Sequence, residues 1–293
     1  MLMRGGFGVG GPRVTAMPAL QSRFEGPQLD GRQQPRRLIL AGLLGALVGV
    51  LGGMIGLGGA EFRLPLLVTV FGFAALQAVI VNKALSLILV AAALPARLLG
   101  VPFDAVAPYW PVVVNLLAGS LIGAWLGATW ATRMASRNLY RTLSLLLAAI
   151  AVLLVWSHLG GVEPLGLTGV VQVVVGVLAG VVIGVAAALM GVAGGELLIP
   201  AIVLLFGVDI KIAGSLSLAV SLPTMLVAFA RYSRDQAFAV LGQNRGFVGS
   251  MAIGSILGAL LGGLLLGVVP SIVLVPLLAA LLVLSAVKVW HHA

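Results

Sequence analysis

Two glycine-rich segments, residues 56–65 and 191–200, carry the residue types best suited to binding chemistry. They read Gly-Leu-Gly-Gly-Ala-Glu-Phe-Arg-Leu-Pro and Gly-Val-Ala-Gly-Gly-Glu-Leu-Leu-Ile-Pro. Each ends a long apolar stretch and opens a shorter one. Glycine lets the backbone unwind there, and a proline near the first turn of the next helix costs no hydrogen bond. The N–H groups at such a helix start favour an anion. The backbone positions predicted to bind it are Gly58, Gly59, Gly194 and Gly195.

Each segment also contains one carboxyl group, Glu61 in the first and Glu196 in the second. An ionisable side chain inside an apolar stretch is costly and indicates function by default. Two interpretations remain open. The pair carries protons, since burial favours a neutral carboxyl group, or each glutamate only complements the dipole of the helix that it starts. A carboxylate beside an anion site repels the anion, which favours proton coupling. We favour Glu61 as the proton carrier, because Arg63 and Lys83 belong to the same half of the chain and can tune the pKa of its carboxyl group.

The most informative cation is Lys83, within the run Val-Asn-Lys-Ala-Leu-Ser of residues 81–86. As a substrate-binding residue, it neutralises an anion. As a structural residue, it pairs with Glu61 or Glu196 or extends to the membrane interface. Arg63 can pair with a carboxylate, line the anion path or extend to the membrane interface. The neutral side chains predicted to donate hydrogen bonds to the anion are Asn82, Ser86, Ser217 and Ser221. Serines in such helices more often bond to backbone or to neighbouring helices.

The composition requires lipid around most of the chain. Hydrophobic residues make up 61% of the 293 residues and charged residues only 9%, against about 25% charged residues in soluble domains. The net charge of +9 lies in the N-terminal tail and in short loops, which indicates membrane orientation and not nucleic-acid binding. There is no cysteine, and the three histidines have no metal-ligand spacing. We therefore expect neither a metal nor a cofactor.

Apolar stretches predict eight full spans and two half-length helices. About 20 residues cross the hydrocarbon core, and the stretches of this length are Leu38–Leu57, Ala78–Leu99, Tyr109–Ala131, Leu139–Trp156, Leu167–Met190, Ile212–Ala230, Gly246–Val268 and Ile272–Trp290. Two shorter stretches, Phe62–Phe73 and Leu197–Val208, are predicted as half-helices or re-entrant arms. Arginines before the first span and in two later loops predict a multi-pass protein of the cell membrane with both termini in the cytoplasm.

The two glycine-rich segments belong to an internal repeat at an offset of 135 residues. This offset pairs Glu61 with Glu196 and Pro65 with Pro200, and it aligns glycines and serines along the later helices. We divide the chain into a disordered, basic cytoplasmic tail (1–37), a first transmembrane repeat (38–157) and a second one (167–290). The sides assigned to the charged loops are consistent only if each half makes an odd number of net crossings. We therefore predict an all-α integral membrane fold with two inverted-topology repeats, which is typical of secondary transporters.

The repeated Gly-x-x-Gly-(Gly/Ala)-Glu-x-x-x-Pro segments, each followed by Phe-Gly and an Ala/Ser-rich helix, resemble those of the sulfite exporter TauE/SafE-type permeases over residues 38–290. The resemblance implies a permease for sulfite, a sulfonate or a related organosulfur anion, working by alternating access in the lipid bilayer. Two other classes stay open, an anion channel and a membrane assembly or scaffold protein. The spans contain no Ser/His/Asp set and no His-Glu-x-x-His motif, which argues against an enzyme.

Overall fold

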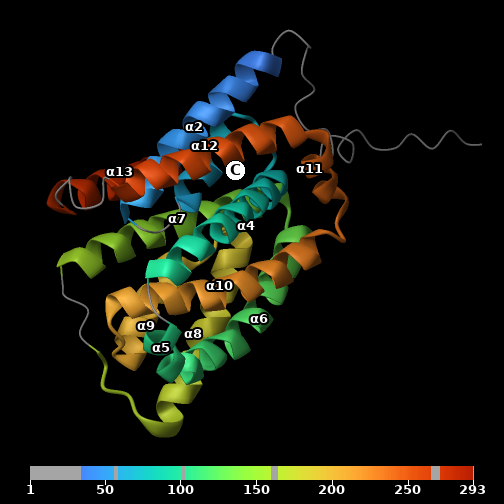
Figure 1. Ribbon diagram of the computed structural model, residues 1–293. Helices are drawn as coiled ribbons and strands as arrows, with labels where there is room; N and C mark the ends of the chain where they lie inside the picture. The colour runs from blue at the N-terminus through green and yellow to red at the C-terminus, as the bar shows by residue number, and fades with distance from the viewer. Residues whose placement is uncertain (1–33, 56–58, 101–102, 160–163, 265–270, 293) are drawn as a thin grey trace, which may run out of the picture.

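The computed structural model describes residues 34–55, 59–100, 103–159, 164–264 and 271–292, and every regular element in these ranges is a helix (Figure 1). The main helices are α2 (Gln34–Ile55), α3 (Ala60–Thr69), α4 (Ala75–Gly100), α6 (Trp110–Arg133), α7 (Ser136–Leu159), α8 (Gly169–Met190), α9 (Gly195–Phe206), α10 (Ile210–Tyr232), α12 (Arg245–Leu264) and α13 (Ser271–Trp290). The short helices between them are α5 (Phe103–Val106), η1 (Ala107–Tyr109), η2 (Gln236–Phe238) and α11 (Ala239–Gln243).

Seven of the described helices are long and apolar enough to cross a membrane, and the predicted all-α membrane fold is thereby confirmed. The two predicted half-helices are present as α3 and α9, which have only 10 and 12 residues. A helix of this length reaches about 18 Å, short of the ~30 Å hydrocarbon core. Helix α2 begins at Gln34, so the last residues of the predicted tail are helical. The rest of that tail lies outside the described residues.

Two closely packed helix pairs lie on either side of the molecule: α2 packs along α12, and α6 packs along α8 (Figure 1). Glycines line both contacts, because a missing side chain lets two helix backbones touch. A Cβ atom at Gly258 would fall on the carbonyl oxygen of Ala46, and one at Gly123 would fall on that of Val181. Each pair joins a helix of the first half to a helix of the second. The two halves of the chain are therefore interwoven.

Helices α4 and α10 lie between these pairs, and α7 packs against α13 (Figure 1). Helix α4 occupies the most central position, in contact with α3, α8, α10 and α12. Every residue from Gln77 to Ser86 is buried. Polar side chains in this part of α4 must therefore find their hydrogen-bond partners inside the protein.

The broken helices form two helical hairpins, α2–α3 and α8–α9. In each, one side chain forms a hydrogen bond between the start of the long helix and the end of the short helix, which together are the open end of the hairpin. Arg37, near the start of α2, donates a hydrogen bond to the carbonyl oxygen of Phe71 just after α3, at 3.0 Å. At the equivalent position of the second half, Gln172 of α8 donates to the carbonyl oxygen of Leu205 in α9, at 2.8 Å. Each short helix therefore runs back beside the long helix that precedes it.

Candidate anion-binding site

The two short helices begin at glycines whose backbone conformation disfavours any other residue. Gly59 and Gly194 have φ angles of +66° and +86°, and each is the N-cap of its helix without a side-chain cap. An uncapped helix start leaves its first N–H groups directed out of the helix, as the predicted anion site requires. Gly195 is the first residue of α9. Gly58 lies outside the described residues.

Glu61 and Glu196 lie in the first turns of α3 and α9 and are only 2% and 8% exposed. They come from different halves of the chain, yet their carboxyl groups interact with each other and with Arg63. One oxygen of Glu61 and both oxygens of Glu196 find no hydrogen-bond donor among the described residues, and a hydrogen bond between the two carboxyl groups themselves requires a proton on one of them. Structural carboxyl groups are normally bonded when buried, so this pair points to a function.

Arg63 is completely buried and joins three helices. Its Nε donates to Oδ1 of Asn82 at 2.9 Å, and its Nη2 donates to Oγ of Ser86 at 2.8 Å. A longer bond of 3.5 Å runs from Nη1 to Oγ of Ser255 on α12. Among the described residues, no carboxylate lies within ion-pair distance of this guanidinium. The three hydrogen bonds that the described residues form with this side chain therefore all lead to neutral oxygens.

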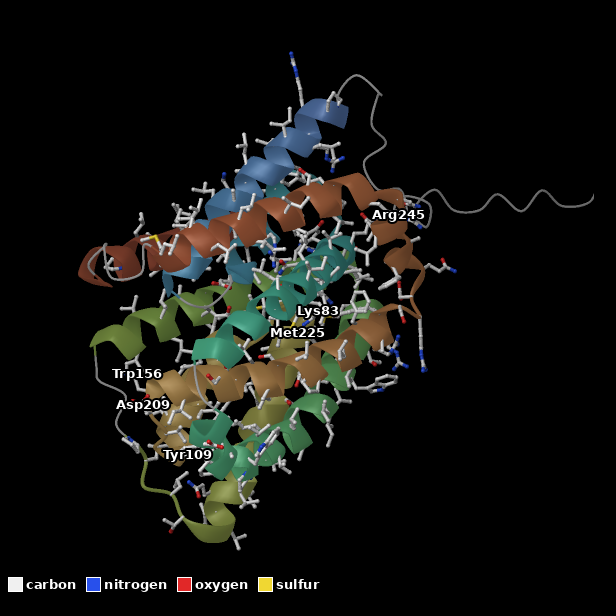
Figure 2. All side chains as sticks on the ribbon, in the orientation of Figure 1. Lys83, Tyr109, Trp156, Asp209, Met225 and Arg245 are labelled. Carbon is white, nitrogen blue, oxygen red and sulfur yellow. The ribbon has the colours of Figure 1, made fainter. Side chains whose placement is uncertain are left out.

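Lys83 lies in the middle of the bundle, as does Met225 of α10, while Arg245 lies at one side and Tyr109 and Asp209 at the other (Figure 2). It is 1% exposed. Its Nζ donates to the carbonyl oxygens of Ala187 at 2.9 Å and Val192 at 2.6 Å. These two carbonyl groups flank the point where α8 ends, and a cation complements the negative end of a helix. The ammonium group therefore lies in the protein interior and not at the membrane interface.

Two more residues of α4 complete this contact with the α8–α9 break. Nδ2 of Asn82 donates to the carbonyl oxygens of both Ala60 in α3 and Met190 in α8, each at 3.0 Å. Oγ of Ser86 donates to the carbonyl oxygen of Gly191 at 3.2 Å. Asn82 therefore links the start of one short helix to the end of the long helix that leads to the other.

The equivalent positions on α10 behave differently. Ser217, which aligns with Asn82, donates to the carbonyl oxygen of Gly214 in its own helix at 2.9 Å. Ser221, which aligns with Ser86, is 1% exposed, and its hydroxyl has no partner among the described residues. The structure therefore gathers the predicted polar residues of the first half around the breaks, whereas Ser217 bonds within α10.

Two contacts to this region were not predicted from the sequence. Ser255 binds Arg63, and the hydroxyl of Tyr232 donates to the carbonyl oxygen of Ala188 in the last turn of α8, at 2.9 Å. The repeat marks Ser255, since the offset aligns it with Ser120. No sequence signal marks Tyr232. In the described part of the chain, no group of three His, Cys, Asp or Glu side chains is arranged to hold a metal ion.

This geometry defines a class of protein, a multi-pass α-helical membrane protein in which two broken helices carry buried charges into the interior. The chain belongs to the sulfite exporter TauE/SafE family, whose sequence model matches residues 13–154 and residues 42–289. These two matches overlap and together cover both halves of the repeat. Neither the comparison with curated proteins nor the comparison with solved structures gave a significant match.

Proposed function

We propose that this chain is a secondary transporter of a small anion, namely sulfite, a sulfonate or a related organosulfur anion. Membership of the TauE/SafE family supports a membrane transporter for sulfur-containing anions. The observation that carries the proposal is the fully buried Arg63, held by neutral oxygens near the uncapped starts of α3 and α9. A buried cation and two positive helix ends together attract an anion. A scaffold protein does not need this costly arrangement.

Alternating access between two repeats is supported by the contacts at the helix ends. Arg37, at the open end of the α2–α3 hairpin, lies against the start of α12. The start of α12 is joined to the end of α10 by a short connection. At the end of α10, Arg231 donates to Thr129 near the end of α6. At the start of α6, Asn115 donates to Val173, near the open end of the α8–α9 hairpin. We infer that the hairpins open toward opposite ends of the molecule, as inverted repeats do.

We place the protein in the cell membrane with both termini in the cytoplasm. Arg37 and Arg231 belong to the same end of the molecule by the contacts just described, and an excess of arginine marks the cytoplasmic side. The end of α13 lies at this end too. Arg141, near the start of α7, stacks on the ring of Trp290 with 5.5 Å between the guanidinium carbon and the ring centroid.

Charge balance favours the coupling of transport to protons. The four ionisable side chains of the site are Glu61 and Arg63 on α3, Lys83 on α4 and Glu196 on α9. If both carboxyl groups are ionised, their charges cancel those of the two cations. A bound monoanion then adds an uncompensated negative charge in an interior of low dielectric, which is costly. One proton on either glutamate restores the balance. We therefore propose that one proton accompanies each negative charge of the substrate.

The decisive experiment is uptake of labelled sulfite by liposomes that contain the purified protein. A transporter shows a flux that saturates with sulfite concentration, counterflow, and accumulation when a pH gradient is imposed. Methanesulfonate and chloride, added as competitors, test the substrate class. A flux that neither saturates nor supports counterflow identifies a channel. A lack of flux for sulfite and for methanesulfonate would falsify the proposed function.

A further inference from the structure

We propose that Arg63 is the residue that contacts the transported anion, and that Lys83 is a positioning residue that holds the break between α8 and α9. This inference rests on the proposed function and assigns separate roles to the two buried cations. Both side chains are at most 1% exposed, and both come from the first half of the chain. The difference between them lies in the chemistry of their partners.

Lys83 already has backbone partners that complement its charge. An ammonium group has three N–H donors, and two of them bind the carbonyl oxygens of Ala187 and Val192. Its neighbours on α4 bind the carbonyl oxygens of Met190 and Gly191. Carbonyl groups at the end of a helix carry partial negative charge. The position of the lysine is therefore explained by the helix break itself.

Arg63 has hydrogen-bond partners but no complementary charge at contact distance. A guanidinium has five N–H donors, and three bonds lead to the neutral side chains of Asn82, Ser86 and Ser255. These oxygens orient the group without cancelling its charge. The donors that remain form part of a planar fork that matches two oxygens of one oxyanion. A sulfite or sulfonate group has this geometry, whereas a halide does not.

The interactions of the two carboxyl groups also support an anion at Arg63. Both Glu61 and Glu196 interact with Arg63, and Glu196 interacts with Lys83 as well, yet neither forms an ion pair with Arg63, and their oxygens without a donor are buried. An anion on Arg63 therefore meets these carboxyl groups, at the point where the proposed coupling needs a proton. The repeat supplies no second cation of this kind, because Leu198 and Leu218 occupy the positions equivalent to Arg63 and Lys83. The geometry thus provides one anion site per chain.

The test measures two quantities on the purified full-length protein in lipid nanodiscs, the Kd for sulfite by calorimetry and the Tm without ligand. Arg63→Gln is expected to weaken sulfite binding on the order of 100-fold, as loss of a buried charge partner does. Arg63→Lys keeps the charge but not the planar fork, so its Kd should lie between that of the unaltered chain and that of Arg63→Gln. Lys83→Met should lower the Tm by several degrees and change the Kd much less, and Lys83→Arg should restore the Tm. Arg37→Gln, which removes a guanidinium far from the breaks, is the matched control for the Kd.

Several results would overturn the assignment. One is a folded Arg63→Gln protein that binds sulfite as tightly as the unaltered chain. Another is a Lys83→Met protein that keeps its Tm but loses sulfite binding. If Arg63→Gln does not fold, Arg63→Lys decides, because an unchanged Kd in that variant contradicts bidentate contact. If the unaltered chain binds neither sulfite nor methanesulfonate, the proposed function itself fails, and the assignment fails with it.

Discussion

The hairpins α2–α3 and α8–α9 share a backbone plan but not a set of polar side chains. Each has a left-handed glycine before its short helix, a buried glutamate in the first turn and a proline inside the helix. Each is fastened at its open end by one side-chain donor. Arg63 occurs only in the first hairpin, however, and Leu198 takes its place in the second. A break in a helix requires the backbone features in both copies, whereas one anion requires only one set of cations.

The central helices α4 and α10 show the same division. Asn82 and Ser86 on α4 bind the α8–α9 break, while Ser217 on α10 bonds within its own helix. A duplicated set of buried cations would leave more positive charge in the interior than one small anion can compensate, and a buried uncompensated charge is costly. The two halves therefore share the backbone scaffold, whereas the side chains proposed to bind the anion lie in the first half.

Labelling of single cysteines tests whether the two hairpins face opposite sides of the membrane, with an all-or-none result. Cysteine is introduced in place of Gln34, Ser136 or Gly161 in this cysteine-free chain. We expect a membrane-impermeant maleimide to label Gly161→Cys from outside the cell, and to label the other two only after permeabilisation. Labelling of Ser136→Cys and Gly161→Cys from the same side would break the inverted arrangement.

Valine in place of either of the two equivalent packing glycines, Gly123 and Gly258, should lower the yield of folded protein severely and by a similar amount. Gly123→Val and Gly258→Val each place a side chain on the backbone of the partner helix. Overpacking typically costs about 1–3 kcal/mol, and more when backbones must separate. The yield of monodisperse protein by size-exclusion chromatography measures the effect. Gly249→Val, where a Cβ atom meets nothing within 4 Å, is the control. A severe loss in only one of the two variants would show that the helix pairs are not equivalent.

Glutamine substitution of the two glutamates separates their roles. If both only complement helix dipoles, Glu61→Gln and Glu196→Gln should behave alike, each losing about 0.3–1 kcal/mol of stability while keeping proton-driven transport. We expect instead that Glu61→Gln abolishes accumulation driven by a pH gradient but keeps sulfite exchange, because glutamine imitates the neutral carboxyl group. Liposome uptake with and without the gradient makes the measurement. Full proton-driven accumulation in both single variants and in the double variant ends the coupling proposal.

The smallest expected effect concerns Arg37 and Gln172, the side chains that form the hydrogen bonds at the open ends of the hairpins. The guanidinium of Arg37 lies 5.3–5.9 Å from the ring centroids of Phe71, Phe73 and Phe247, whereas the side chain of Gln172 makes one hydrogen bond within the described residues. Arg37→Gln should keep a donor for the carbonyl oxygen of Phe71 and lose the cation–π contacts, at a cost of about 0.5–2 kcal/mol. Gln172→Ala should cost about 0.5–1.5 kcal/mol. Thermal unfolding measures both. A Tm unchanged by Arg37→Gln would show that the aromatic contacts do not stabilise the first hairpin.

Much of this architecture followed from the sequence alone, because lipid leaves few alternatives. An apolar stretch in a bilayer must satisfy its backbone internally, so length and composition predict the helices. The glycines and prolines located both breaks, since they mark where a helix must stop and start again. The offset of 135 residues pairs Glu61 with Glu196 from the sequence alone.

Only the tertiary structure decided which polar groups meet. From the sequence, Lys83 could contact an anion, a glutamate or the membrane interface. In the structure its ammonium donates to the carbonyl oxygens of Ala187 and Val192 and also interacts with Glu196. Those carbonyl oxygens are backbone atoms more than a hundred residues away, and no side-chain pattern announces them. Arg63 and Ser255 likewise meet because α12 packs along α2. Periodicity identifies the buried part of a helix, but the partner of a buried charge depends on which helices pack together, and that is decided by contacts across the whole chain.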